Sequence, residues 1–258
     1  MTIPDPKITP LDFKKYGALK AEDYMRNYET YFGKLTQEEI KLLELGVHEG
    51  GSLLMWRDYF RKGTIVGLDF KKNMDQNLPD RVKVYCGKQQ DVQLLDRLAK
   101  ENAPSGFDII IDDCSHFGEY TRASFWHLFK NHLKPGGFYV IEDWGAAYWK
   151  KWPDGAHPKS DPSERGSFLR RFFGAFLDFL IGNKVVSKWL SPKSQGKYLP
   201  ALSLYKQRFP SHDYGLVGVI KQLIDEFGMQ WAGIHDARFG KITIYPGQVF
   251  LEKSETNK

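Results

Sequence analysis

The chain has few cysteines and no long hydrophobic run, and each shortage excludes a class of protein. Two cysteines among 258 residues are too few for a disulfide-stabilised scaffold, so a reducing cytoplasm is the expected location. No apolar run approaches the roughly 20 residues of a membrane-spanning helix. The first residues contain neither a basic region nor an apolar stretch, so no signal peptide is expected. These absences predict a cytoplasmic protein that does not associate with a membrane.

A strong excess of charge of one sign is also missing. The 37 lysines and arginines stand against 32 aspartates and glutamates, which gives a formal net charge of +5. The basic residues are scattered, with no basic helix and no aromatic-interleaved RNA motif, so no nucleic-acid partner is expected. Internal repeats and low-complexity tracts are absent as well. The length suits one α/β domain with a sizeable core and an insertion.

The most informative segment is an apolar run that ends in a glycine-containing turn. Residues 42–45 lead into Gly46, Gly50 and Gly51 begin a helix-like stretch, and a second apolar run ends at Asp69. Glycines let the backbone approach a ligand closely, and an acid about 20 residues beyond the turn can accept hydrogen bonds from ribose hydroxyls. This pattern predicts a site for a nucleoside-containing cofactor. The alternative is an ordinary strand-turn-helix whose glycines serve only the turn.

The spacing and charge of this turn favour S-adenosylmethionine over NAD. A dinucleotide site has the pattern G-x-G-x-x-G, with a pyrophosphate at the helix N-terminus. Here the glycines are spaced differently, Glu49 lies in the turn and Glu44 precedes it. Carboxylates at these positions repel a pyrophosphate but suit a cationic sulfonium. An NAD-linked oxidoreductase remains an alternative, which nicotinamide binding would reveal.

Alternating strands and helices predict an α/β, Rossmann-like fold with a mostly parallel sheet, helices on both faces and a C-terminal antiparallel hairpin. We divide the chain into an N-terminal helical segment, 1–40, and a domain, 41–258, with an aromatic-rich insertion at about 144–214 over the strand tips. Strands are expected at 42–46, 64–69, 82–86, 107–113, 138–143, 241–245 and 248–252, and helices at 11–32, 51–60, 91–101, 120–133, 168–180 and 216–227.

Acidic pairs follow two neighbouring strands of the predicted sheet. Asp112 and Asp113 end one strand, and Glu142 and Asp143 end the next. Right-handed crossovers bring the carboxyl ends of such strands to one edge, where ligands bind in open α/β sheets. Closely spaced carboxylates need a cation, and an all-oxygen set suits Mg²⁺. The alternative is that these acids cap the following helices and form salt bridges.

Two further features lie close to these acids in the sequence. His116 follows Asp113 by three residues, and an imidazole beside a metal is a candidate general base, although a histidine after a strand can equally cap a helix or lie on the surface. Trp149 and Trp152 either stack on an acceptor or pack in the core. The phenylalanines of 168–180 are expected to pack in the core, with a membrane-surface helix as the alternative.

These motifs resemble class I methyltransferases of the macrocin and mycinamicin sugar O-methyltransferase type. The resemblance implies metal-dependent transfer of a methyl group from S-adenosylmethionine to a hydroxyl of a sugar or glycosylated natural product, by a homo-oligomer. A cephalosporin-hydroxylase-like or rhamnosyl methyltransferase relative, and a non-catalytic protein that binds S-adenosylmethionine, remain alternatives. The resemblance spans about 16–253, is weakest at 150–214, and rests on the runs 43–56, 110–116, 134–143, 148–149 and 250–253.

The resemblance also implies roles for individual residues. His116 is the expected base, with Asp113 beside it as a second catalytic residue. The expected Mg²⁺ ligands are Asp113, Glu142 and Asp143. Relatives have an acid where this chain has Lys88 and Thr-Ser where it has Ala146-Ala147, so the acceptor stays unidentified. The expected cofactor-binding residues are Glu44, Gly46, Gly50, Ser52, Asp69, Gln89, Asp91 and Asp112.

Overall fold

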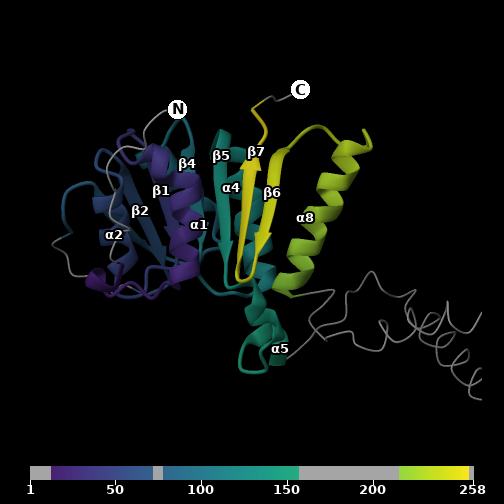
Figure 1. Ribbon diagram of the computed structural model, residues 1–258, viewed down its shortest axis with the longest axis horizontal. Helices are drawn as coiled ribbons and strands as arrows, with labels where there is room; N and C mark the ends of the chain where they lie inside the picture. Colours follow the sequence, from purple (N-terminus) through teal and green to yellow (C-terminus); the bar gives the residue numbers. More distant parts are fainter. Residues whose placement is uncertain (1–12, 72–77, 157–214, 256–258) are drawn as a thin grey trace, which may run out of the picture.

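Seven strands form one sheet in the order β3-β2-β1-β4-β5-β7-β6 within residues 13–71, 78–156 and 215–255, which the computed structural model describes (Figure 1). Neighbouring strands from β3 to β5 are parallel, whereas β7 runs antiparallel to both β5 and β6. The predicted α/β fold class is therefore confirmed, including its C-terminal hairpin. The strands are β1 (Lys41–Leu45), β2 (Thr64–Asp69), β3 (Val82–Cys86), β4 (Phe107–Asp112), β5 (Leu133–Glu142), β6 (Phe239–Tyr245) and β7 (Gln248–Lys253).

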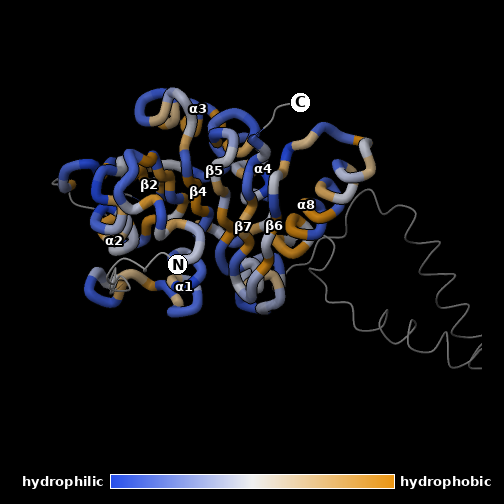
Figure 2. Tube along the Cα trace, turned by 45° about the horizontal axis from the view of Figure 1, so that its top comes forward, coloured by the Kyte–Doolittle hydropathy of each residue, from blue (hydrophilic) through white to orange (hydrophobic). Residues whose placement is uncertain are grey.

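Helices cover both faces of the sheet. Helices α1 and α2 contribute to one hydrophobic cluster, and α3, α4 and α8 contribute to another on the opposite face. Apolar segments concentrate along the central strands and on the inner sides of the helices (Figure 2). The helices are η1 (Phe13–Tyr16), α1 (Glu22–Phe32), η2 (Gly33–Leu35), α2 (Gly51–Tyr59), α3 (Val92–Asn102), α4 (Gly118–Asn131), η3 (Trp144–Tyr148), α5 (Pro153–Ala156) and α8 (Leu216–Trp231).

The central strands are apolar along their whole length because both of their faces are covered. In β4, Ile110 packs into the cluster under α3, α4 and α8, while Ile109 and Ile111 pack into the cluster under α1 and α2. Successive side chains of a strand point to opposite faces, so a doubly covered strand needs apolar residues at every position. The polar residues of these strands gather at their ends, and this brings Asp69, Asp112 and Glu142 to the carboxyl edge.

Several predicted boundaries were wrong. Helix α8 continues past the expected end at 227 to Trp231, and β6 begins at Phe239 rather than at 241. Two larger differences have a clear physical reason. The helix expected at 11–32 is interrupted in the described part, because Gly17 has a left-handed φ of 66° and the chain then runs extended until α1 begins at Glu22. The strand expected at 138–143 begins earlier, at Leu133, which pairs with Phe107 of β4. A register shift next to Phe107 and a left-handed Gly136 let the Lys134–Gly137 segment continue in the sheet as an irregular stretch.

The expected insertion at 144–214 is only partly within the described residues. Its first part forms η3 and α5, and 157–214, with the predicted helix at 168–180, lies outside them. The expectation about this segment therefore stays a prediction. Among the described helices, none combines the length and the apolar character that crossing a membrane requires.

Helix α1 is fixed to the domain by aromatic packing. Phe32 is fully buried and its ring lies 5.4–6.3 Å, centroid to centroid, from those of Tyr28, Phe60, Phe138 and Phe250. Such ring contacts add to the burial of a large apolar surface. They attach the N-terminal segment to β5 and β7, and this holds the preceding residues over the edge of the sheet.

We predict that Phe32→Ala lowers the free energy of unfolding by about 3–5 kcal/mol, because it leaves a cavity among these rings. Urea denaturation followed by circular dichroism measures the change. Phe70→Ala is the matched control, since the Phe70 side chain is 64% exposed, and it should alter stability far less. Equal losses for the two variants would contradict the role given to this cluster.

Candidate functional site

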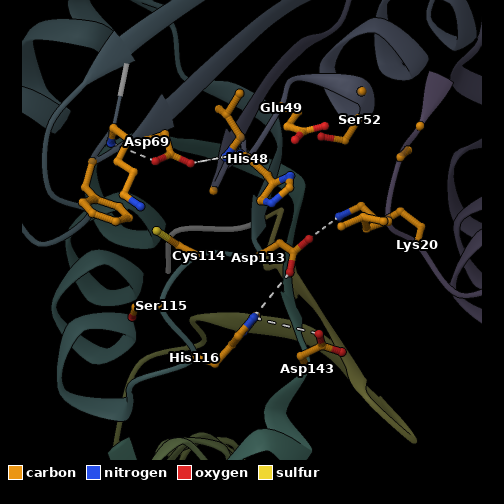
Figure 3. Close-up of a pocket in the computed structure, with 18 of the residues that line it drawn as sticks. Lys20, His48, Glu49, Ser52, Asp69, Asp113, Cys114, Ser115, His116 and Asp143 are labelled. Carbon is orange, nitrogen blue, oxygen red and sulfur yellow. Dashed lines mark hydrogen bonds and ion pairs between the residues drawn. The ribbon is translucent and has the colours of Figure 1, made fainter. Parts of the chain in front are cut away.

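A pocket of about 440 Å³ opens at the carboxyl ends of the parallel strands (Figure 3). Its walls come from five segments that are far apart in the sequence: 17–20, the turn after β1, the end of β2, the loop after β4, and Asp143 with Trp152. This is the edge at which open α/β sheets bind their ligands. Six of the expected site residues line it, namely Gly46, Ser52, Asp69, Asp113, His116 and Asp143.

The glycine turn after β1 forms the wall nearest to the sheet. Gly46 has a φ of 89°, and a Cβ on it would collide with the backbone carbonyl of Asp113. Gly50 is the left-handed N-cap of α2, with a φ of 87°. These glycines allow two strand ends to approach each other closely and the chain to reverse into α2. The fold itself therefore requires glycine at both positions, whether or not a ligand is bound.

Asp69 uses its carboxylate to hold this turn. One oxygen accepts hydrogen bonds from the backbone N–H groups of Val47 and His48, at 2.8 and 3.0 Å, and the other accepts one from Lys71 at 2.9 Å. Each carboxylate oxygen has two lone pairs, so the side chain keeps capacity for a further donor. Asp69 is thus placed at the pocket wall with its orientation already set.

A second group of expected site residues lies beneath the pocket. Gln89 is buried, donates to Asp112 at 3.2 Å and accepts a hydrogen bond from the backbone N–H of Ser115 at 3.1 Å. Asp112 also accepts hydrogen bonds from Ser124 and Tyr139. This network supports the loop that carries His116. Neither Gln89 nor Asp112 lines the pocket.

Asp91 stands apart from this group. Its side chain accepts a hydrogen bond from the backbone N–H of Leu94 and caps the N-terminus of α3, and the residue is exposed. Aspartate is one of the residue types that stabilise the start of a helix in this way. The geometry therefore gives Asp91 a local structural role and places it outside the pocket lining.

Burial changes the ionisation of Asp112. It raises the pKa of this carboxyl from 3.8 to about 6, while Tyr139, His116 and Ser124 oppose the rise and Asp113 adds to it. Burial also raises the pKa of the nearby Cys114 thiol, with the charges of Asp112, Asp69 and Asp113 adding to the effect. Both groups thus hold a proton more readily than they would in water, chiefly because they are buried.

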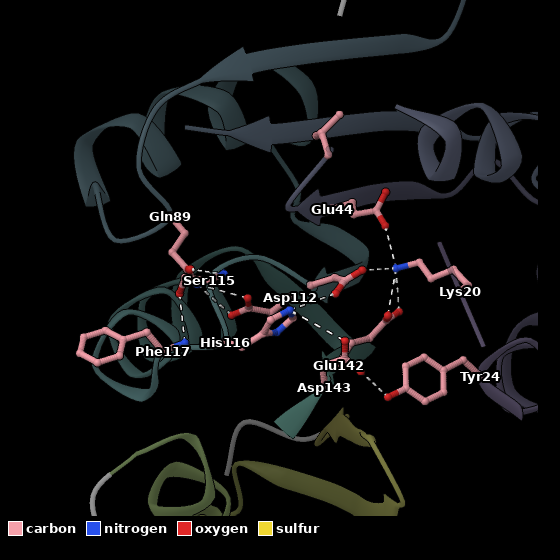
Figure 4. Close-up of polar contacts among 12 residues, drawn as sticks. Lys20, Tyr24, Glu44, Gln89, Asp112, Ser115, His116, Phe117, Glu142 and Asp143 are labelled. Atoms are coloured by element: carbon pink, nitrogen blue, oxygen red, sulfur yellow. Dashed lines mark hydrogen bonds and ion pairs between the residues drawn. The ribbon is translucent and has the colours of Figure 1, made fainter. Parts of the chain in front are cut away.

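The ammonium group of Lys20 lies inside the acidic cluster that the sequence predicts at this edge (Figure 4). Its Nζ is 2.6 Å from Asp113 Oδ2, 2.9 Å from Glu142 Oε1 and 3.2 Å from Glu44 Oε1. The Lys20 side chain is only 2% exposed. Glu44 also accepts a hydrogen bond from Ser52, at 2.7 Å. One buried cation thus joins carboxylates from three different strand ends.

The pKa values in this cluster follow from burial and charge. Burial alone would lower the pKa of Lys20, but Asp113, Glu142 and Glu44 outweigh it and hold that pKa well above its usual range. Burial, aided by Asp113, raises the pKa of Glu142 to about 8, against the opposing effects of Lys20 and Tyr28. The raised pKa of Glu142 means that this carboxyl tends to hold a proton, which a further cation at the cluster would replace.

A second group of side chains, all of them potential metal ligands, faces the pocket on the other side of Asp113. Asp113, His116 and Asp143 each offer one ligand atom, and these atoms all lie within 4.8 Å of one another. His116 Nε2 is 3.8 Å from Asp113 Oδ1 and 3.9 Å from Asp143 Oδ2 (Figure 3). Lys20 binds the opposite oxygen of Asp113, so the Oδ1 atom remains directed towards His116. Hard oxygen donors at such spacing fit a Mg²⁺ ion.

Backbone conformation and packing orient these side chains. His116 and Asp143 both have a left-handed φ, of 50° and 53°, which is uncommon for residues other than glycine and occurs mostly where the surrounding structure enforces it. The His116 ring meets the Trp152 ring edge to face at 5.0 Å between centroids. Tyr24 of α1 donates a hydrogen bond to Asp143 Oδ1. Each of the three potential metal ligands is therefore held in place by contacts with residues outside this group.

The contribution of the N-terminal segment to the site was not predicted from the sequence. Lys20, Tyr24 and Tyr28 all contact acids of the cluster, and Tyr28 donates a hydrogen bond to Glu142. Tyr24 and Tyr28 are four residues apart and therefore lie on one side of α1, and Lys20 lies in the segment just before that helix. That spacing was the signal in the sequence. It becomes informative only once α1 is known to lie beside β5.

Comparison with known proteins places these features beside those of sugar O-methyltransferases. No family model matches the chain. It is 41% identical over 147 residues to mycinamicin VI 2''-O-methyltransferase from Micromonospora griseorubida, which covers 54% of this chain and 34% of the relative. It is 39% identical over 160 residues to demethylmacrocin O-methyltransferase from Streptomyces fradiae, with 59% and 39% covered. These alignments thus span between a third and two fifths of the relatives' length. The resemblance stated from the motifs is confirmed.

The solved structures that match support the same fold. The MycE methyltransferase from the mycinamycin biosynthetic pathway, in complex with Mg, SAH and mycinamycin VI, superposes with a TM-score of 0.61 at 27% identity, over 93% of this chain and 53% of that chain. A second MycE structure, in complex with Mg and SAH, gives a TM-score of 0.63 at 28% identity with the same coverage. The chain has the class I methyltransferase fold.

We predict that Lys20→Met lowers the free energy of unfolding by about 3–5 kcal/mol, because it removes the ammonium that Asp113 and the two buried carboxyls of Glu44 and Glu142 share in this cluster. Urea denaturation at neutral pH measures the loss. Lys14→Met is the control: its ion pair with Glu22 is exposed, so the change there should stay below about 1 kcal/mol. A Lys20→Met protein as stable as the parent would show that the cluster does not depend on this cation.

A pH-dependent contribution is expected from Asp112. Because its pKa is about 6 in the folded protein and 3.8 is its ordinary value, the unfolded chain releases this proton first as the pH rises. Its contribution to stability is therefore full below pH 3.8 and is lost as the pH rises through 6. The free energy of unfolding of the parent, relative to that of Asp112→Asn, should fall by about 3 kcal/mol between these limits.

Urea titrations of both proteins at several pH values measure this difference. Asp80→Asn is the control, since the Asp80 side chain is exposed, and its difference from the parent should not change with pH in this way. A constant gap between the parent and Asp112→Asn across the range would contradict the raised pKa.

Proposed function

We propose that this protein transfers a methyl group from S-adenosylmethionine to a hydroxyl of a sugar or glycosylated natural product, in a metal-dependent reaction. The observation that carries the proposal is the pocket at the carboxyl edge, where His116 faces Asp113 and Asp143 beside the glycine turn. The relatives named for O-methylation of mycinamicin VI and demethylmacrocin supply the reaction and the acceptor class. Because the chain matches only part of their length, the activity of the whole protein is proposed here.

The glycine turn and the end of β2 are proposed to hold the methyl donor. Gly46 and Gly50 form the turn, and Asp69 is oriented by two backbone N–H groups of that turn, with one lone pair of Oδ1 left for a ribose hydroxyl. Glu44 and Ser52 lie at the base of the turn, and Gln89 and Asp112 support the adjoining loop. The sulfonium of the cofactor makes its methyl carbon electrophilic, and the negative charge of this edge suits that cation.

Asp113, Asp143 and Glu142 are proposed to hold a divalent ion such as Mg²⁺. The fit rests on the oxygens of Asp113 and Asp143 that face His116, and on the number of carboxyl groups gathered at this edge. Glu142 already accepts hydrogen bonds from Lys20 at both of its oxygens and from Tyr28 at Oε1, which leaves one lone pair, on Oε2, for the ion. A bound ion would act as a Lewis acid and lower the pKa of an acceptor hydroxyl.

The proposed reaction is an in-line displacement in which the acceptor oxygen forms a bond to the methyl carbon as its bond to sulfur breaks. The pocket contributes by aligning the two reactants, which removes much of the entropic barrier. His116 takes the proton of the hydroxyl at Nε2, the nitrogen that faces Asp113 and Asp143. The edge-to-face contact with Trp152 keeps the ring in that orientation.

The acceptor is proposed to enter from the side of Trp152 and Trp149. Trp152 lines the pocket next to His116, and Trp149 is exposed nearby at the end of η3. Aromatic walls with a few fixed polar groups are typical of small-molecule sites and suit the apolar faces of a glycoside. We also retain the expectation of a homo-oligomer, which sedimentation of the purified protein would test.

The direct test is a mass-shift assay. The protein is incubated with S-adenosylmethionine, Mg²⁺ and a panel of macrolide glycosides and other deoxysugar glycosides, and the products are analysed for a gain of one CH₂. Formation of S-adenosylhomocysteine together with a methylated glycoside supports the proposal. Tight binding of the cofactor with no methylated product from any hydroxylated acceptor would instead indicate a non-catalytic protein.

We predict that Asp113→Ala and Glu142→Ala each lower turnover by at least about 100-fold while binding of S-adenosylmethionine survives, because both contribute to the proposed ion site rather than to the cofactor turn. Initial rates and calorimetric titration with the cofactor separate the two effects. Asp80→Ala, which removes an exposed carboxylate, should leave both unchanged. Full activity in the presence of excess EDTA would refute metal dependence while leaving the methyl transfer itself standing.

A further inference from the structure

Two histidines and an aspartate form a separate cluster on the far side of the domain. Asp96 lies on α3, His127 on α4, and His132 between α4 and β5. The Nε2 atoms of His127 and His132 lie 2.7 and 2.6 Å from the same oxygen of Asp96, its Oδ1. The three residues offer one ligand atom each within 4.8 Å of one another. We propose that this cluster binds a divalent transition-metal ion, with zinc as the best match, and joins α3 to the junction of α4 and β5.

The cluster is independent of the proposed active site. His132 directly precedes Leu133, the first residue of β5, and its carbonyl accepts a hydrogen bond from the backbone N–H of Phe107, the first residue of β4. Both strands begin there and end at the pocket, so the cluster lies at the amino edge of the sheet and the pocket at the carboxyl edge. None of its three residues lines the pocket.

The chemistry of the donors selects the class of ion. Two imidazole nitrogens and one carboxylate oxygen are a ligand set that zinc uses with a water in its fourth position. Imidazole also suits copper and nickel, whereas Mg²⁺ prefers a shell of oxygens. The side chains of His127 and His132 are 18% and 19% exposed, and that of Asp96 is 56% exposed, so water can reach a fourth position.

Only a small rearrangement separates the present geometry from a metal site. The present separations of 2.7 and 2.6 Å are those of hydrogen bonds. Ligand atoms on a tetrahedral zinc ion, at about 2.0–2.1 Å from it, stand about 3.3 Å apart. The Asp96 oxygen therefore has to move about 0.6–0.7 Å away from each nitrogen, and rotation of its exposed side chain can supply this. The two imidazole nitrogens already lie within 4.8 Å of each other and have to settle at about 3.3 Å.

The surroundings of His127 also suit a metal ligand. A histidine that binds through Nε2 carries its proton on Nδ1, and that proton needs an acceptor. The side-chain amide of Asn131 lies 3.4 Å from His127 Nδ1. Its nitrogen and oxygen positions can be exchanged by a rotation of the amide, which brings the oxygen to His127 as the acceptor. Without a metal ion, the cluster is an exposed ion pair, and such pairs contribute little to the stability of a protein.

The test uses the full chain after treatment with a chelator and dialysis, with excess Mg²⁺ present so that the carboxyl edge is saturated. Calorimetric titration with ZnCl₂ should show one zinc ion per chain, and zinc should raise the melting temperature. Asp96→Asn, His127→Gln and His132→Gln should each weaken zinc binding at least about tenfold, the lower bound known for loss of an outer-shell partner. His235→Gln, which removes an imidazole outside the cluster, should bind zinc as the parent does.

Cobalt provides a readout that does not depend on any variant. Co²⁺ titrated into the parent protein should give the visible absorption bands of a tetrahedral site, and zinc should abolish them. Absence of these bands together with no uptake of zinc would overturn the proposal. It would also be overturned if the double variant His127→Gln/His132→Gln, shown to be folded by circular dichroism, bound zinc with the affinity of the parent. Neither result bears on the proposed methyl transfer, because both are measured without cofactor or acceptor.

Discussion

The ion cluster around Lys20 is the constraint on which the carboxyl edge of this protein depends. Three strand ends bring Glu44, Asp113 and Glu142 together, the two glutamates buried and Asp113 partly buried, and only an opposite charge makes that arrangement tolerable. Lys20 supplies the charge from a segment that precedes the sheet in the chain. The geometry of the pocket therefore depends on a residue that belongs to none of the strands.

This dependence explains why α1 is part of the site. The aromatic rings of Tyr28 and Phe32 anchor the helix to the sheet, and the same helix directs the hydroxyls of Tyr24 and Tyr28 at Asp143 and Glu142. Packing energy on one side of α1 thus positions polar groups at its N-terminal end. Apolar burial supplies the stability, and the hydrogen bonds supply the orientation of the acids.

Lys20 and a divalent ion need not compete for the same place. The ammonium contacts Asp113 through Oδ2, whereas Oδ1 is directed towards His116 and, with Asp143 Oδ2, towards the pocket. The carboxylate of Asp113 therefore has one oxygen towards the protein interior and one towards the ligand side. Because Lys20 fixes the carboxylate of Asp113 from the interior, this carboxylate is already oriented for the proposed reaction and does not have to move.

The sequence by itself determined the α/β alternation, the hairpin, the glycine turn with Asp69, and the gathering of acids at one sheet edge, because these follow from local periodicity and from the shared direction of parallel strands. Only the tertiary structure decided which residues bind to those acids. The approach of Lys20, Tyr24 and Tyr28 depends on where α1 docks, and the meeting of Asp96 with His127 and His132 depends on how α3 lies beside α4. Such contacts join residues far apart in the chain, and no local pattern encodes them.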